Sequence, residues 1–207
     1  MRQTGSYPVV YMFVVTAAFS SVIIGFAAMT RERVQANARL ALERAVVEAL
    51  PGLYEPGLSS VEIHNRFVEQ VTEPDPSTGG AYALRKDGQI AAYALPFEGQ
   101  GFWAPIRGIL GIAADKRTVT GIAIYDQAET PGLGAEIAQP AFRGQFKGKT
   151  LAREEKPINM RRPGAELGEN DVYAVTGATQ TSVRLEAVIN RVVNEWQSQV
   201  GKEGIAQ

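Results

Sequence analysis

Four hydroxyl side chains lie within seven residues near the C-terminal end of the chain. The segment reads TGATQTS, residues 176–182, and an amphipathic helical pattern follows it directly. The first turn of a helix carries unpartnered backbone N–H groups and the positive end of the macrodipole, so hydroxyls placed there can help to surround a phosphate. Ser and Thr are also preferred helix caps, so capping alone remains an alternative. The candidate phosphate-binding residues are Thr176, Gly177, Ala178, Thr179, Thr181 and Ser182.

A second candidate segment is DQAETPGLGAE, residues 126–136, which directly follows a predicted strand. Its Pro-Gly step and second glycine predict a tight loop with backbone positions at positive φ. Loops at strand ends are favoured ligand sites, although a plain connecting turn is the more frequent outcome. Asp126 and Glu129 could form a hydrolytic carboxylate pair, but no nucleophile elbow accompanies them and this interpretation is disfavoured. The candidate ligand-binding residues here are Glu129, Thr130, Gly132, Leu133 and Gly134.

Two further features have simpler interpretations. The stretch GQGFW, residues 99–103, lies between two predicted hairpins, and its residue types favour a loop whose aromatic side chains close the edge of the core. The single histidine, His64, lies in a weakly patterned region, which favours a surface residue over a ligand. We expect no metal site and no catalytic side chain of its own in this chain.

The composition excludes several classes of function. The chain has no cysteine, which rules out thiolate zinc sites, Cys-ligated iron–sulfur clusters, disulfides and thiol nucleophiles. A net charge of −1 provides no broad basic surface, so nucleic-acid binding is not expected. Any redox centre held by this chain must therefore come from an organic cofactor.

The elements that must position these residues begin with an apolar helix. Residues 1–30 contain only one of the 43 charged side chains, Arg2, and residues 9–29 carry no charge at all. At about 1.5 Å per residue these 21 residues span roughly 30 Å, the thickness of a bilayer's hydrocarbon core. A cleaved signal peptide is the alternative, but the run exceeds an ordinary signal-peptide core and Arg31-Glu32-Arg33 ends it. Counting arginines on either side slightly favours a cytoplasmic soluble domain.

The remaining sequence predicts an α+β domain with antiparallel hairpins. Residues 31–50 continue as an amphipathic helix that Pro51-Gly52 ends. Residues 81–84 with 89–95, and 106–114 with 118–125, predict two hairpins. From Val183 to Val200 an apolar stripe recurs at helical spacing. The predicted organisation is an N-terminal tail (1–8), a transmembrane helix (9–29), an amphipathic connecting helix (30–52) and a ligand-binding domain (53–207).

Taken together, the anchor and the two motifs resemble the FMN-binding subunit family of bacterial respiratory redox pumps. This family comprises the C-type subunit of the sodium-translocating NADH:quinone reductase and the G-type subunit of the Rnf ferredoxin:NAD reductase. The likeness runs from the anchor through the last helix and rests on TGATQTS (176–182) and ETPGLG (129–134) in combination. The stretch GQGFW (99–103) resembles the quinone-reductase branch, which favours that branch over the Rnf branch.

The resemblance implies that FMN is attached covalently, through a phosphoester bond, to the hydroxyl of Thr181. A separate flavin transferase makes this bond in the family. The loop 129–134 would lie beside the flavin, with Thr130 and Leu133 in contact with it. The expected function is an electron-transfer subunit of an ion-translocating oxidoreductase complex, whose partners are integral membrane redox subunits. The expected location is the bacterial inner membrane, with one span and a periplasmic soluble domain, against the arginine count.

The sequence departs from the family at one position and leaves two rival functions open. An Asp often stands three residues before the Ser/Thr-Gly-Ala step; here that residue is Tyr173, and Asp171 lies two residues earlier. One rival is a membrane-anchored FMN-binding sensor or regulatory module without electron flow. The other is a structural anchor subunit in which the hydroxyl-rich motif only caps a helix.

Overall fold

The computed structural model describes residues 6–153 and 155–202. By its internal contacts the chain divides into two units, residues 1–40 and 41–207. Helix α1 (Tyr7–Ala49) contributes its first part to one unit and its last turns to the other. The N-terminal unit consists, in its described residues, of this helix alone.

In the N-terminal unit, α1 carries the uncharged run. Among the residues that the structure describes, it is the one helix long and apolar enough to cross a membrane, and a signal sequence would satisfy the same criteria. Its hydroxyl groups bond within the helix: Ser21 Oγ donates to the Ala17 carbonyl at 2.7 Å, and Thr30 Oγ1 donates to the Phe26 carbonyl at 3.0 Å. These donors are therefore satisfied without water, as an apolar medium requires.

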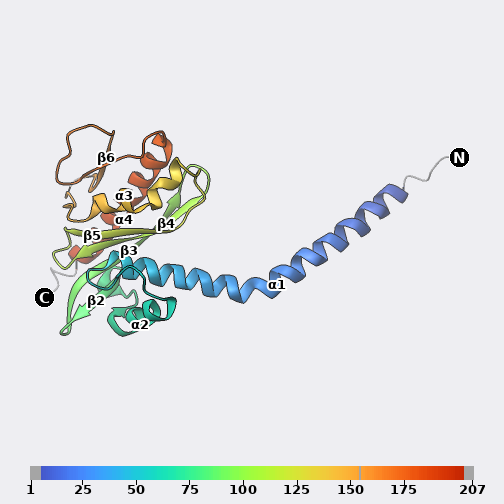
Figure 1. The fold of residues 1–207 in the computed structure, drawn as a ribbon, viewed down its shortest axis with the longest axis horizontal. Helices are drawn as coiled ribbons and strands as arrows, with labels where there is room; N and C mark the ends of the chain where they lie inside the picture. The colour runs from blue at the N-terminus through green and yellow to red at the C-terminus, as the bar shows by residue number, and fades with distance from the viewer. Residues whose placement is uncertain (1–5, 154, 203–207) are drawn as a thin grey trace. The chain divides into compact units, whose positions relative to one another are not determined.

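The second unit is built on a five-stranded antiparallel sheet in which sequence neighbours pair, in the order β1-β2-β3-β4-β5 (Figure 1). Both predicted hairpins are present. The first turns at Asp87-Gly88, whose φ values of 52° and 77° suit the left-handed backbone of a two-residue turn. The strands are β1 (Val71–Thr72), β2 (Tyr82–Lys86), β3 (Gln89–Gln100), β4 (Pro105–Ala113) and β5 (Val119–Asp126).

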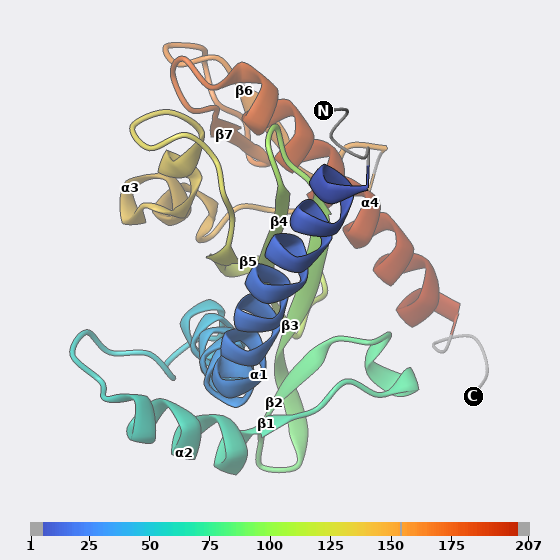
Figure 2. The same ribbon diagram turned by 90° about the vertical axis from the view of Figure 1, so that its right-hand side faces the viewer.

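Alternation along the strands sends side chains into two separate cores. On β3, Tyr93, Leu95 and Phe97 join the core that contains α4 (Thr179–Lys202). The intervening Ala92 and Ala94 face the other core, which contains the end of α1 and the helix α2 (Ser60–Gln70). Figure 2 shows the sheet between α4 and α2. Both faces of the sheet are thus buried, which explains the continuous apolar character of β3 and β4.

The other elements are short and connect these layers. A 3₁₀ turn, η1 (Pro76–Thr78), precedes β2. Three short helical pieces follow β5, and two three-residue strands then pair in parallel before α4 begins. They are η2 (Gly134–Ala138), α3 (Pro140–Arg143), η3 (Gly144–Phe146), β6 (Asn159–Arg161) and β7 (Asp171–Tyr173). The architecture is α+β, as the sequence predicts.

Two helices differ in detail from the sequence prediction. The weakly patterned region contains α2, which starts with a capping box in which Ser59 and Glu62 bond each other's backbone N–H groups. Only Ile63 and Phe67 of this helix are buried, so its apolar stripe is too narrow to stand out in the sequence. Helix α4 begins at Thr179, four residues earlier than the apolar stripe indicates, and Val183 is exposed.

A contact at the last residue of α1, Ala49, leads to a stability prediction. Thr120 Oγ1 donates to the Ala49 carbonyl at 2.7 Å, and a Cβ at Gly111 would lie only 2.1 Å from that carbonyl oxygen. Gly111→Ala is expected to destabilise the domain by about 2 kcal/mol or more, because the methyl group meets backbone that cannot yield. Thermal melting checks this. Gly144→Ala is the matched control, since nothing lies within 4 Å of its added Cβ, and equal melting temperatures for the two variants would contradict the prediction.

Candidate functional site

Three segments that are distant in the sequence meet around one cavity of about 280 Å³. They are the turn after β3, the loop after β5 and the first turn of α4. The cavity is lined by Phe102 and Trp103, by Glu129, Thr130, Leu133 and Gly134, and by the run from Gly177 to Thr181. The two motifs that the sequence singled out therefore face the same space, together with the aromatic pair between the hairpins.

Glu129 connects all three segments. Its Oε2 accepts a hydrogen bond from the Thr181 hydroxyl at 2.7 Å, and its Oε1 accepts one from the Trp103 backbone N–H at 3.1 Å. The side chains of Glu129 and Thr181 are buried, with residue exposures of 5% and 4%. A buried carboxylate needs hydrogen-bond donors to offset its lost hydration, so these two bonds fix its position.

Glycines make room for this carboxylate on both sides. A Cβ at Gly101 would lie 2.5 Å from Glu129 Oε1, and a Cβ at Gly134 would lie 2.8 Å from Oε2 and 2.6 Å from Thr181 Oγ1. At Gly177 the backbone has φ +77° and an added Cβ would lie 3.0 Å from Leu133. The absence of side chains at these positions is what allows the loop, the turn and the helix start to approach each other.

The structure brings most, but not all, of the sequence-predicted residues to the cavity. Thr176, Gly132 and Ser182 do not line it. Ser182 is buried, and its Oγ accepts a hydrogen bond from the Val175 backbone N–H at 3.1 Å, so it stabilises the turn that leads into α4. Gly132 has φ +72°, which accounts for glycine in the loop on conformational grounds alone. The hydroxyl-rich motif therefore combines capping residues with cavity residues.

The aromatic pair does not close the core, contrary to the prediction from its residue types. Phe102 and Trp103 are 45% and 66% exposed and meet edge to face with their ring centroids 4.9 Å apart. The Trp103 indole N–H donates to Thr130 Oγ1 at 3.1 Å, which ties the turn to the second motif. Two exposed aromatic rings at the mouth of a cavity are suited to contact a flat ligand. Spacing alone could not distinguish this role from core packing.

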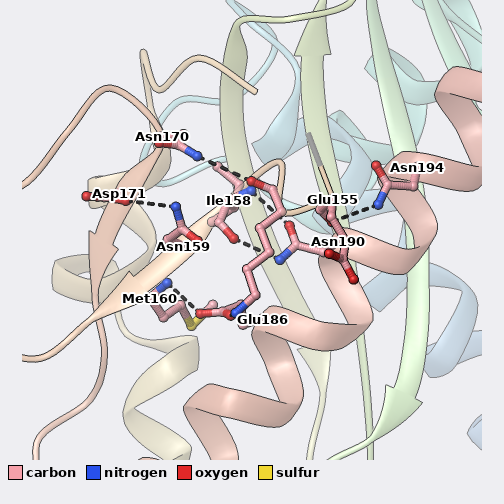
Figure 3. A network of polar contacts seen from close by, with 10 residues as sticks. Glu155, Ile158, Asn159, Met160, Asn170, Asp171, Glu186, Asn190 and Asn194 are labelled. Atoms are coloured by element: carbon pink, nitrogen blue, oxygen red, sulfur yellow. Dashed lines mark hydrogen bonds and ion pairs between the residues drawn. The ribbon is translucent and has the colours of Figure 1, made fainter. Parts of the chain in front are cut away.

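A polar network attaches the middle of α4 to the segment around β6 (Figure 3). The buried Asn190 side chain bonds both backbone groups of Ile158, accepting from its N–H and donating to its carbonyl, each at 2.8 Å. One turn earlier, Glu186 Oε2 accepts from the Met160 backbone N–H at 2.6 Å. One turn later, Asn194 donates to the Glu155 carbonyl at 3.0 Å. Side chains on one face of α4 thus form hydrogen bonds with backbone groups of the segment around β6.

Asp171, two residues before Tyr173, belongs to this network. Burial raises the pKa of its carboxyl, but hydrogen bonds from the Gly168 N–H, Asn159 and Arg161 outweigh burial and hold that pKa below its usual value. Tyr173 instead donates its hydroxyl to the Ala165 carbonyl at 3.0 Å. Neither side chain lines the cavity, so both act by shaping the segment that enters α4.

The disfavoured interpretations from the sequence fail on geometry. Asp126 forms an ion pair with Arg107 at 2.7 Å, whereas Glu129 is buried against Thr181, so the two carboxylates do not act as a pair. His64 Nδ1 lies 2.8 Å from a Glu43 carboxylate oxygen, on α2 and away from the cavity. Over residues 6–153 and 155–202, no group of three potential metal ligands is present.

The cavity combines features suited to a phosphorylated aromatic ligand. Thr181 offers a buried hydroxyl in the first turn of α4, where the helix dipole favours an anion. Thr130 and Thr179 line the same space, as do the exposed Phe102 and Trp103. The small residues of the helix start leave room for a bulky group next to this hydroxyl.

Comparison with known proteins agrees with this description. Residues 101–194 match the family described as the FMN-binding domain. The chain is 35% identical over 126 residues to the C-type subunit of the Na(+)-translocating NADH-quinone reductase of Pasteurella multocida, covering 59% of this chain and 46% of that protein. The corresponding Vibrio vulnificus protein is 40% identical over 109 residues, covering 51% and 43%. The chain thus spans about half the length of these curated relatives.

A solved structure shares the fold. The crystal structure of Shewanella oneidensis NqrC superposes with a TM-score of 0.70 at 21% sequence identity, covering 83% of this chain and all of that one. At this identity the likeness concerns the fold alone.

Proposed function

We propose that this chain, whose residues 101–194 match the FMN-binding domain family and which is similar to the C-type subunits of the Na(+)-translocating NADH-quinone reductases, carries FMN covalently on Thr181. We further propose that it serves as a membrane-anchored electron-transfer subunit of such a complex. The single observation that carries the proposal is the cavity in which both motifs meet around the Thr181 hydroxyl. A helix cap alone would not require that hydroxyl to face the loop 129–134.

The residues around the cavity fit FMN. Thr181 would hold the phosphate as an ester at the positive end of α4, while Gly177, Ala178 and Thr179 border the same space. Thr130 and Leu133, with Phe102 and Trp103, would flank the ring system, and Glu129 orients the Thr181 hydroxyl. When bound, FMN supplies the redox chemistry that a chain without cysteine or a metal-binding group in its described residues lacks. The protein's part is to fix the cofactor and to exclude water from the attachment point.

Removing the attachment hydroxyl tests the covalent linkage. In the full-length chain co-expressed with a flavin transferase, Thr181→Ala is expected to abolish the fluorescent flavin band on a denaturing gel and the mass increment of one FMN. Thr179→Ala is the matched control and should retain some flavin, because Thr179 lines the cavity but lies two residues before the attachment point and is exposed. Circular dichroism confirms that both variants fold. Flavin retained by Thr181→Ala, or lost only in Thr179→Ala, would assign the linkage to another residue.

The electron-transfer role is proposed together with partners. The relatives are subunits of an NADH-quinone reductase, and we infer that this chain works beside integral membrane redox subunits of an ion-translocating complex. The aromatic stretch 99–103 favours this complex over an Rnf-type one. A separate flavin transferase would supply the cofactor.

Rapid mixing of the assembled complex with its reductant tests that role against a sensor. Flavin on Thr181 is expected to be reduced and reoxidised at least as fast as the complex turns over, as followed by the visible absorbance of the oxidised flavin. The complex carrying Thr181→Ala serves as the spectral control. Flavin reduction slower than turnover would exclude a place for this cofactor on the electron path and favour the sensor.

The side of the membrane is proposed from the family likeness: the domain would lie in the periplasm, with α1 as a single span. The chain contains no cysteine, so one introduced thiol reports its side cleanly. In intact spheroplasts a membrane-impermeant maleimide is expected to label Ala187→Cys, which replaces an exposed residue of α4. Ser6→Cys, at the opposite end of the span, should react only after lysis. The reverse pattern would place the domain in the cytoplasm.

A further inference from the structure

The hydrogen bond between Glu129 and Thr181 has a chemical consequence beyond positioning. We propose that Glu129 is the proton acceptor for the reaction that esterifies Thr181, so the modified protein supplies the base for its own modification. The inference rests on the proposed function, because it concerns the step that attaches FMN. It starts from one contact, the Thr181 hydroxyl donating to Glu129 Oε2 at 2.7 Å, with both side chains buried.

The step balances as a phosphoryl transfer. An unmodified phosphate monoester has no good leaving group, so the donor must be a flavin nucleotide activated as a pyrophosphate, such as flavin adenine dinucleotide, held by the transferase. Thr181 Oγ1 forms a new bond to the phosphorus of the FMN phosphate, and the P–O bond of the pyrophosphate breaks. The adenylate leaves with the bonding electron pair. The hydroxyl proton of Thr181 passes to Glu129 Oε2, the atom with which it is already hydrogen-bonded.

No other group lining the cavity can take this proton. Of the residues that surround it, Glu129 is the one with an ionisable side chain. Its second oxygen accepts from the Trp103 backbone N–H at 3.1 Å, which holds Oε2 toward the hydroxyl. A general base must lie within hydrogen-bond reach of the proton that it removes. Glu129 Oε2 already meets this condition in the chain without cofactor. The positive end of α4 stabilises the negative charge that develops on Oγ1.

The product state also favours a proton on Glu129. Once Oγ1 is an ester oxygen it has no hydrogen to donate, so an ionised Glu129 would face both this oxygen and the negative phosphate without its former partner. A protonated Glu129 can instead donate to the ester or phosphate oxygen. The absence of a side chain at Gly134 leaves room for this contact, because an added Cβ would lie within 2.8 Å of both Glu129 Oε2 and Thr181 Oγ1.

The experiment measures the initial rate of flavin attachment to the full-length chain, purified without cofactor, with a flavin transferase and flavin adenine dinucleotide. Glu129→Gln keeps the size of the side chain and its acceptor toward Trp103 but cannot accept the proton. Its rate is expected to fall about 100-fold or more, the usual contribution of a general base. Glu136→Gln is the matched control, since it removes the same charge from the adjoining 3₁₀ helix η2 without lining the cavity, and its rate should equal that of the wild type.

Chemical rescue separates proton transfer from a structural role. Glu129→Ala leaves space for a small carboxylate, so added formate is expected to accelerate its flavin attachment, whereas chloride at equal ionic strength should not. Melting curves verify that the variants are folded. A Glu129→Gln rate close to that of the wild type, or a folded Glu129→Ala protein that formate does not accelerate, overturns the inference. If the wild-type chain itself took up no flavin, the proposed function would fail, and that result is visible before any variant is compared.

Discussion

The buried carboxylate of Glu129 is the interaction on which the site depends. Taking an ionised carboxyl out of water costs several kcal/mol unless donors surround it. Here the donors come from two other parts of the chain: the Trp103 backbone N–H and the Thr181 hydroxyl. The cost of burial is offset only when the turn after β3, the loop after β5 and the start of α4 are all in place. The site therefore exists only when all three segments are folded.

The rest of the second unit supplies the rigidity that this arrangement needs. Helix α4 is fixed on its apolar side by the sheet core and on its polar side by the backbone of the segment around β6. Asn190 is the centre of the second attachment, because it satisfies both backbone groups of one buried residue. With both sides held, the first turn of α4 has little freedom to shift relative to the loop 129–134. A short hydrogen bond between buried groups requires that precision.

The sequence predicts much of this fold because its local signals agree with its tertiary structure. The Asp87-Gly88 turn and the apolar stripe of α4 each determine an element without reference to distant residues. Helix α2 escapes prediction since only Ile63 and Phe67 are buried and its capping box is the remaining signal. The two site motifs stand out by composition, whereas their meeting in one cavity depends on β-sheet pairing over many residues. The exposure of Trp103 likewise depends on tertiary structure, so residue type alone favoured the core.

Glycine at positions 101 and 134 restricts what else this site could accommodate. A methyl group at position 101 would lie 2.5 Å from a Glu129 oxygen and 2.7 Å from the Ala104 carbonyl oxygen, and one at position 134 would lie 2.6 Å from Thr181 Oγ1 and 2.8 Å from Glu129 Oε2. Shortening the side chain at position 129 would relieve only part of either clash, because the Ala104 carbonyl and the Thr181 hydroxyl would still lie within 2.7 Å of the added methyl groups. A chain without this glutamate would therefore still need both glycines. The close approach of the turn, the loop and the helix start is thus a property of the backbone, which the carboxylate then uses.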